Sequence, residues 1–198
     1  MLYIMRHGKT EWNALHKLQG RTDIPLNEEG RSMASDACKK YKDLNIDACY
    51  CSPLKRAVET AQIVLKDREI PIRTDERLVE MCFGEYEGIE NSFAIPNCPI
   101  NILFEKPEAY LESVGGAETF AQLFARTGSF LREVIEPQLQ DGKDILIVGH
   151  GAMNASIICQ VKGLPIEKFW SAGLEQCKIL ELSGSNASFL AFPSCADV

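Results

Sequence analysis

The chain has 198 residues, of which 45% are hydrophobic and 25% are charged. This length and balance are typical of one globular domain, and they exclude a collagen, a coiled coil and a disordered chain. Lys and Arg total 21 against 28 Asp and Glu, so the formal net charge is −7. An acidic surface argues against nucleic acid as a partner, because it would repel a polyanion.

Membrane insertion is not expected, because no window approaches the ~20 apolar residues that a spanning helix needs. The longest apolar stretch, residues 94–104, is interrupted by Pro96 and Pro99. The eight cysteines are scattered in a chain with no secretory start, so we expect reduced thiols in a cytoplasmic protein. The sequence leaves a monomer or a homodimer open.

Strands and helices alternate from the first residues onward. The apolar run 1–5 predicts a buried strand that ends at Arg6 and His7. Asn27 is predicted to cap a helix that reaches about Tyr41. A second strand is predicted at 47–51, and Ser52 followed by Pro53 predicts a helix that starts at the proline and runs to about Lys66.

The second half of the chain continues the alternation after an irregular region. A third strand is predicted at 70–74, an acidic loop at 80–88, and a lid-like insert at about 89–116. The remaining predicted elements are a helix at 117–135 stopped near Pro137, a strand at 144–148, a helix opened by Gly149, His150 and Gly151, and two strands at 177–182 and 188–192.

This order predicts an α/β fold, a three-layer sandwich whose mostly parallel sheet carries helices on both faces. We expect one domain over residues 1–198, including the insert. Ligands bind such sheets at the carboxyl ends of the strands. Arg6 with His7, Ser52, and Gly149 with His150 all follow strand ends, so they should meet at one edge.

Two of the three histidines, His7 and His150, lie between an apolar strand and a glycine. One such histidine alone is more often a hydrogen-bonded structural residue, and His16 in its polar loop is expected to be solvated. Arg6 and Arg56 supply two guanidinium groups, which match a phosphate dianion in charge and in bidentate geometry. Their charge should lower the pKa of His7 and keep its imidazole nucleophilic. The helix that opens at Gly151 offers further backbone donors.

Phosphoryl transfer also needs a proton for the leaving oxygen, and Glu80 is the candidate donor. It opens an acidic loop beside Met81 and Phe83, and a bound phosphate dianion would favour its protonated form. Glu85 and Glu87 are rivals that we otherwise expect to be solvated. No metal or other cofactor is implied, since the arginines provide the charge that Mg²⁺ supplies elsewhere.

The chain resembles the histidine phosphatase superfamily, also called the phosphoglycerate mutase-like family. The resemblance is carried by six segments in the family's order: LYIMRHGKTEWN at 2–13, GRTDIPLNEEG at 20–30, SPLKRAVETA at 52–61, residues 80–88, GGAETF at 115–120 and VGHG at 148–151.

The resemblance implies roles that agree with those expected from the residues. His7 becomes the phosphohistidine, Arg6, Arg56 and His150 bind the transferring phosphoryl group, and Glu80 donates the proton. It also suggests Asn13, Thr10 and Gly20 as phosphate or substrate contacts. Lys9 stands where the family more often has Glu or Gln, and its role stays open.

A phosphatase and a cofactor-dependent phosphoglycerate mutase both fit this family. A mutase must hold a doubly charged intermediate, yet Lys106 is the only cation between Met81 and Gly116, among six glutamates. The insert is mainly apolar. We therefore predict a phosphatase for a small phosphorylated metabolite, with a leaving group less charged than phosphoglycerate.

Two other classes of function are alternatives. Gly149, Gly151 and Asn154 follow the spacing of a dinucleotide-binding loop, but the third glycine is missing and only 47 residues follow Gly151. A catalytically silent binder of phosphorylated ligands is the other alternative. The intact set of His7, Arg56, Glu80 and His150 argues against it.

Overall fold

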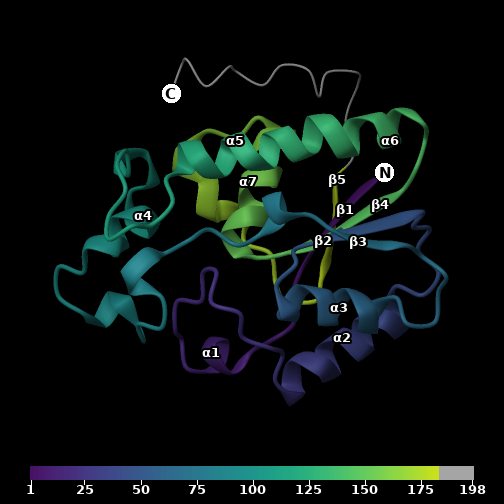
Figure 1. Cartoon of the computed structure of the whole chain (residues 1–198), viewed down its shortest axis with the longest axis horizontal. Helices are drawn as coiled ribbons and strands as arrows, with labels where there is room; N and C mark the ends of the chain where they lie inside the picture. Colours follow the sequence, from purple (N-terminus) through teal and green to yellow (C-terminus); the bar gives the residue numbers. More distant parts are fainter. Residues whose placement is uncertain (183–198) are drawn as a thin grey trace.

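The computed structural model describes residues 1–182, in which five strands form one sheet in the order β3-β2-β4-β1-β5 (Figure 1). The strands are β1 (Leu2–Arg6), β2 (Ala48–Cys51), β3 (Ile72–Thr74), β4 (Ile145–Gly149) and β5 (Ile179–Leu182). β1 to β4 pair in parallel and β5 runs antiparallel to β1. The predicted, mostly parallel sheet is confirmed; the strand predicted at 188–192 lies outside the described residues.

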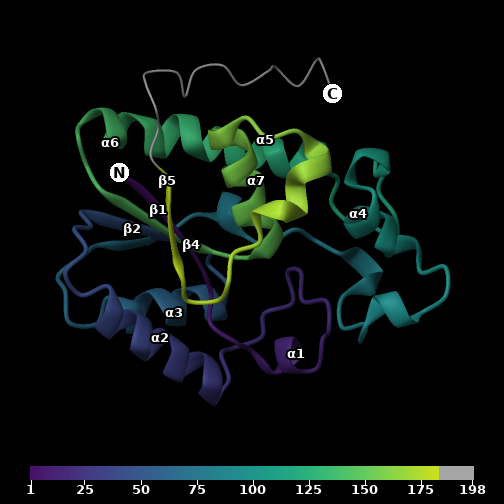
Figure 2. The same ribbon diagram turned by 180° about the vertical axis from the view of Figure 1, so that it is seen from behind.

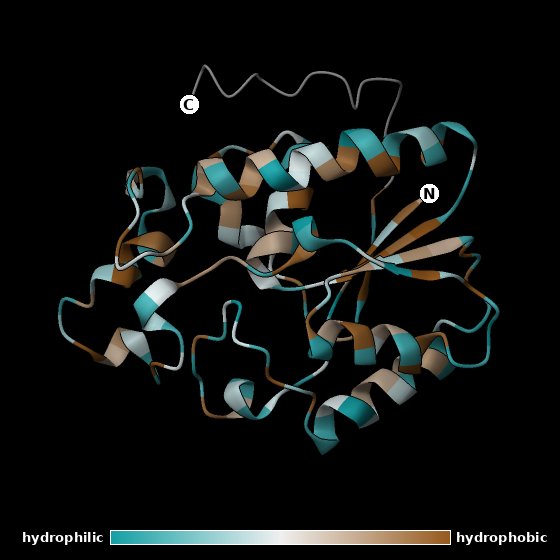
Figure 3. Ribbon diagram, viewed as in Figure 1, coloured by the Kyte–Doolittle hydropathy of each residue, from teal (hydrophilic) through white to brown (hydrophobic). Residues whose placement is uncertain are grey.

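The central strands are buried because helices cover both faces of the sheet. Every residue of β2 and β4 is buried, as their unbroken apolar composition requires of strands covered on two sides (Figure 3). Cys49 and Cys51 are part of this core. The seven cysteines among residues 1–182 are unpaired thiols.

Helices form a layer on each face of the sheet (Figure 1). On one side α2 (Glu28–Lys40) packs against α3 (Lys55–Val64), and on the other α5 (Phe120–Phe130) packs against α7 (Gly151–Lys162). A π-helical turn, Leu131–Ile135, joins α5 to α6 (Glu136–Gln140). Among residues 1–182, no helix combines the length and apolar character of a bilayer span.

The prediction that Pro53 starts a helix is wrong by two residues. The Ser52 hydroxyl accepts the N–H of Leu54 (3.3 Å), which makes a turn, and α3 begins at Lys55. The N–H of Lys55 instead donates to the carboxylate of Asp23 (2.8 Å), a residue distant in sequence. Because this cap comes from another segment, the residues around the start of α3 do not reveal it.

The long helix also departs from prediction at both ends. It begins at Phe120, because Thr119 and Gln122 form a reciprocal capping box. Pro137 does not stop it: the proline is the second residue of α6, a position whose N–H needs no helical partner. The preceding π-turn shifts the hydrogen-bond register and lets a new helical segment start there.

The insert 89–116 consists of short turns and α4 (Ile102–Glu105), at the same end of the molecule as α1 (Glu11–Ala14) (Figure 2). Its apolar side chains, including Ile100, Leu103 and Tyr110, join a buried cluster with Phe120 and Phe169. Lys17 and Glu90 form an isolated antiparallel backbone bridge, which joins the loop after α1 to the start of the insert.

Candidate active site

The register of the sheet brings the two strand-end histidines together. Arg6 of β1 lies opposite Gly149 of β4, and the N–H of His7 donates to the carbonyl of Gly149 (2.9 Å). The rings of His7 and His150 are 5.1 Å apart between centroids and meet edge to face. The predicted juxtaposition at the carboxyl edge of the sheet is therefore observed.

His7 is buried, with Nδ1 2.7 Å from the carbonyl oxygen of Gly8. A carbonyl only accepts, so Nδ1 carries the hydrogen and Nε2 keeps its lone pair. Burial lowers the pKa of His7 well below its usual value, and the charges of Arg56 and Arg6 lower it further. The predicted effect of the two arginines is present, although burial contributes more.

Arg56 is fully buried in the first turn of α3 and organises the site through three bonds. Its Nη1 and Nη2 donate to the carbonyls of Thr22 (2.8 Å) and Gly20 (2.7 Å), and its Nε donates to Nδ1 of His150 (3.2 Å). A guanidinium has five N–H groups, so two remain for a ligand.

The bond from Arg56 also fixes the protonation of His150. Because Nδ1 accepts from the guanidinium, the hydrogen of the neutral imidazole is on Nε2, a buried atom without a partner among the described residues. Burial lowers the pKa of His150 well below its usual value, followed by the charge of Arg56. His150 is thus a neutral hydrogen-bond donor beside His7.

Glu80 is buried, and its carboxylate accepts four backbone N–H groups. Oε2 binds the N–H groups of Gly151 (2.8 Å) and Ala152 (3.2 Å), and Oε1 binds those of Met153 (3.0 Å) and Met81 (2.8 Å). The donors of the α7 N-terminus, which we expected to face the ligand, are therefore held by Glu80. A Cβ on Gly151 would lie 3.5 Å from Oε2 and 3.8 Å from Cζ of Arg6, so glycine keeps the space between them open.

Asn13 lines the cavity, whereas Thr10 is not among its lining residues. The Thr10 hydroxyl caps α1 by accepting the N–H of Asn13 (3.2 Å). Thr10 therefore holds Asn13 in place and does not itself line the cavity. Lys9 pairs with Glu29 at the start of α2 (2.8 Å). His16 is exposed, as expected.

Glu87 has a structural role that the sequence did not reveal. Its carboxylate accepts the N–H groups of Arg21 and Thr22 (both 2.9 Å) and of Phe83 (3.2 Å), and the hydroxyl of Thr22 (2.5 Å). These bonds join the loop at 20–22, whose carbonyls accept from Arg56, to the loop at 80–88, which begins with Glu80. Gly20 is at φ +54°, where a Cβ would collide with this carboxylate. Our expectation of a solvated face holds for Glu85 but is wrong for Glu87.

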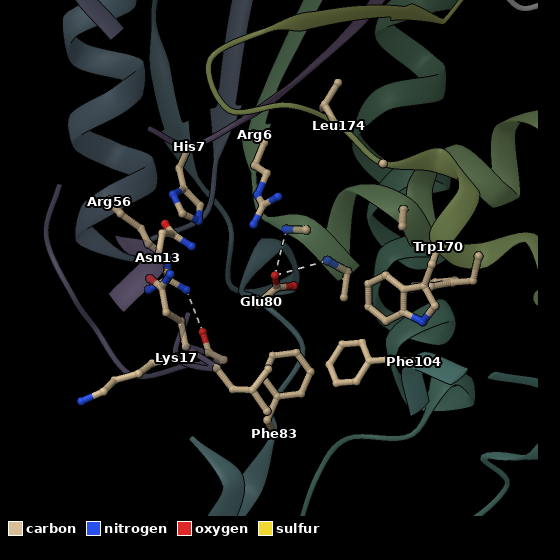
Figure 4. A pocket seen from close by; sticks show the side chains of 18 residues that line it. Arg6, His7, Asn13, Lys17, Arg56, Glu80, Phe83, Phe104, Trp170 and Leu174 are labelled. Carbon is tan, nitrogen blue, oxygen red and sulfur yellow. Dashed lines mark hydrogen bonds between the residues drawn. The ribbon is translucent and has the colours of Figure 1, made fainter. Parts of the chain in front are cut away.

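A cavity of about 210 Å³ lies at this edge of the sheet, and His150 is not among the residues that line it (Figure 4). One half carries the polar groups of Arg6, His7, Asn13, Arg56 and Glu80, and the other half is walled by Phe83, Phe104, Phe169 and Trp170. The ring of Phe104 lies 5.9 Å from that of Phe83 and 5.1 Å from that of Trp170, so the insert contributes directly to the wall. The Lys17 stem is at the rim, with its ammonium group directed away from the cavity (Figure 4).

The arrangement fits an anion better than a metal ion. Arg6 adds a second guanidinium, with its buried Nε unpartnered among residues 1–182. Burial lowers the pKa of both Arg6 and Arg56, but guanidinium groups stay charged. The described part of the chain contains no group of three or more His, Cys, Asp or Glu side chains that would hold a metal.

Comparison with known proteins gives one consistent family. The model of the histidine phosphatase superfamily (branch 1) matches residues 2–190. An "Uncharacterized phosphatase PhoE" of Bacillus subtilis is 33% identical over 161 residues, covering 81% of this chain and 76% of the relative. A 2,3-bisphosphoglycerate-dependent phosphoglycerate mutase of Cytophaga hutchinsonii is 32% identical over 153 residues, covering 76% and 72%.

A solved structure agrees with these relatives. Bacillus stearothermophilus YhfR superposes with a TM-score of 0.81 at 32% identity, covering 92% of this chain and 91% of that one. The phosphoglycerate mutase-like fold expected from the sequence is thereby confirmed.

Proposed function

This chain belongs to the histidine phosphatase superfamily, and we propose that it hydrolyses small phosphate monoesters without a metal, through a phosphohistidine at His7. One observation carries the proposal. The hydrogen bond from Nδ1 to Gly8 leaves a lone pair on Nε2 of His7, a residue that lines the cavity. The buried Nε of Arg6 and Nε2 of His150 have no partner among residues 1–182, and two N–H groups of Arg56 remain free beside them. A nucleophile surrounded by fixed donors suits transfer of a dianionic phosphoryl group.

In the first step, Nε2 of His7 attacks phosphorus. The P–N bond forms as the P–O bond to the alcohol breaks, and the protonated Glu80 gives its proton to the leaving oxygen. The two guanidinium groups and the Nε2–H of His150 stabilise the negative charge on the phosphoryl oxygens. Because each Glu80 oxygen already accepts two N–H groups, Glu80 must release one of these bonds to carry the proton.

In the second step, water attacks the phosphohistidine. Glu80, now a carboxylate, takes a proton from that water, the P–N bond breaks, and its electron pair returns to Nε2. The products are the free alcohol, inorganic phosphate and the original neutral His7. No group beyond those of this chain is needed to balance the reaction.

The far half of the cavity favours water over a sugar acid as the phosphoryl acceptor. A mutase has to hold the carboxylate and the second phosphate of a bisphosphorylated intermediate. Here the half of the cavity that would hold these two groups is walled by Phe83, Phe104 and Trp170, and the ammonium group of Lys17 is directed away from the cavity. An anionic second group would lose its hydration against aromatic rings without gaining a partner. We therefore propose that the preferred leaving alcohol is apolar and without an anionic group.

The decisive experiment measures phosphate release from p-nitrophenyl phosphate in EDTA, comparing the wild type with His7→Gln and with the exposed-site control His16→Gln. We expect the wild type and the control to be equally active and His7→Gln to be inactive. Mass spectrometry of quenched wild-type enzyme should find one phosphate on His7. An inactive wild type, or turnover without that adduct, would refute the proposal.

A substrate comparison separates phosphatase from mutase. Wild-type enzyme is given 1-naphthyl phosphate, phosphoserine or 3-phosphoglycerate, the last with and without 2,3-bisphosphoglycerate. We expect the naphthyl ester to have the highest kcat/KM. Isomerisation of 3-phosphoglycerate that is faster than phosphate release would show a mutase instead.

A further inference from the structure

Gln176 touches the site from a segment that none of the sequence motifs includes. It lies just before β5, in backbone contact with β1: Gln176 forms a bridge with Arg6, and the N–H of Cys177 donates to the Arg6 carbonyl (2.9 Å). Its side-chain Nε2 is 3.0 Å from Oδ1 of Asn13, a residue 163 positions earlier.

The bonds around Asn13 determine which way both amides face. The backbone N–H of Thr10 is 3.1 Å from Oδ1 of Asn13, and because an N–H cannot accept, the atom at that position must be the oxygen. Gln176 must then present its NH₂ group to the same oxygen, and the Thr10 hydroxyl approaches it as well (3.1 Å). Three contacts therefore hold Oδ1.

The Nδ2 group of Asn13 is left free to donate to a ligand. With Oδ1 held, the Nδ2 group has two N–H donors and no protein partner among residues 1–182, in a side chain that lines the cavity beside His7 and Arg56 (Figure 4). A rotated amide would place a carbonyl oxygen there, which would repel a phosphoryl group. The orientation thus decides whether Asn13 attracts or repels the ligand.

We propose that Gln176 is a positioning residue, which locks the Asn13 amide so that its NH₂ group donates to the transferring phosphoryl group. This inference rests on the proposed phosphatase function. Thr10 holds the amide from within its own helix cap, and Gln176 holds it from the segment before β5, which couples the edge of the sheet to the phosphoryl site.

Gln176→Glu tests the lock because it preserves size and removes the donor. A carboxylate at this position faces the Asn13 oxygen with a like partial charge and draws the NH₂ group towards itself. Gln176→Leu removes the donor without adding charge. Glu175→Gln is the matched control, since Glu175 is exposed and its ion pair is to Lys178.

The experiment is a double-mutant cycle of Gln176→Glu with Asn13→Ala. It measures kcat/KM for p-nitrophenyl phosphate and the dissociation constant of orthovanadate. A hydrogen bond to a charged ligand contributes about 1.5–3 kcal/mol, so we expect Gln176→Glu to lower both kcat/KM and vanadate affinity by about tenfold to a hundredfold. Gln176→Leu should cause a smaller loss, and the control none. In the Asn13→Ala background, Gln176→Glu should change either value by less than about twofold.

A pH series supplies a readout that a purely structural role would not move. A protonated glutamic acid regains a donor, so the ratio of wild-type to Gln176→Glu activity should shrink as the pH approaches about 4.3, within the range where both proteins stay folded. Equal losses in the presence and absence of Asn13 would overturn the inference, because the introduced carboxylate would then act on another group such as Arg6. If the wild type proves inactive, the phosphatase proposal fails, and the vanadate cycle still decides the role of Gln176.

Discussion

The two buried histidines make a quantitative prediction for the pH dependence of stability. Burial and the neighbouring arginines lower the pKa of His7 and of His150 well below 6.5, so both stay neutral in the folded protein. In the unfolded chain each has a pKa of about 6.5 and becomes protonated as the pH falls. The unfolded state therefore binds more protons, and the free energy of unfolding decreases with falling pH.

The size of the effect follows from linkage. Above the unfolded pKa, neither histidine makes the free energy of unfolding depend on pH. Below it, each lowers the free energy of unfolding by about 1.4 kcal/mol per pH unit, until the pH reaches the folded pKa. Between pH 7 and 5 this amounts to at most about 2 kcal/mol for each histidine and about 4 kcal/mol for both, the limit that applies when the folded pKa lies below this range. Against a typical total of about 5–15 kcal/mol, the wild type should lose a large part of its stability at pH 5.

The assay is urea unfolding at pH 7, 6 and 5 in phosphate-free buffer, since bound phosphate would itself stabilise the fold. His7→Gln and His150→Gln should each remove up to about 2 kcal/mol of the decrease, while the exposed control His16→Gln should follow the wild type. Comparison with the wild type cancels the contribution of the carboxylates. If the curves of wild type and His7→Gln run parallel between pH 7 and 5, the conclusion that His7 is neutral in the folded state is wrong.

Three further predictions concern the groups around the histidines. Arg56→Lys should lower kcat/KM by about a hundredfold or more, because one ammonium group cannot bond Gly20, Thr22 and His150 at once; recovery above a tenth of wild-type kcat/KM would contradict this. Glu80→Gln should slow hydrolysis of an alkyl phosphate by about 10²–10⁴-fold but affect p-nitrophenyl phosphate far less, because nitrophenolate leaves without a proton; equal losses on both esters would exclude Glu80 as the acid. Glu87→Ala should cost about 1–3 kcal/mol in urea unfolding and also lower kcat/KM, since it frees the loop that holds Arg56; unchanged kinetics would separate that loop from catalysis.

The sequence was sufficient for features that depend on local pattern and chain order. Apolar runs identified β1, β2 and β4, and parallel pairing then placed His7 next to His150. Asn27 capped α2 as predicted, because the cap and the acidic first turn are adjacent in sequence. The position of Arg56 in the first turn of α3, next to His150, also followed, although α3 starts two residues later than expected.

What the sequence could not supply are contacts between distant segments. Asp23 caps α3, Glu87 closes the loop around Arg56, and Gln176 holds Asn13. Each is a polar side chain on an irregular segment, and nothing in its neighbours distinguishes it from a solvated one. Phe104 is similar, because an apolar residue in an insert packs equally well in the core or against a ligand.

The carboxylates near the cavity show how a chain of net charge −7 is compatible with the proposed phosphate site. Glu80 is surrounded by four backbone N–H groups, and Glu87 by three N–H groups and a hydroxyl. Glu118, from the GGAETF segment, is held by both ends of the Arg126 guanidinium (2.7 and 3.0 Å) and by the N–H of Cys82 (3.3 Å). Each of these three carboxylates is therefore hydrogen-bonded to its own set of donors. The guanidinium groups of Arg6 and Arg56 form no ion pair with any of them within residues 1–182. Because local fields in a buried site depend on nearby groups more than on net charge, two guanidinium groups without an ion-pair partner suit the proposed phosphate ligand even in an acidic protein.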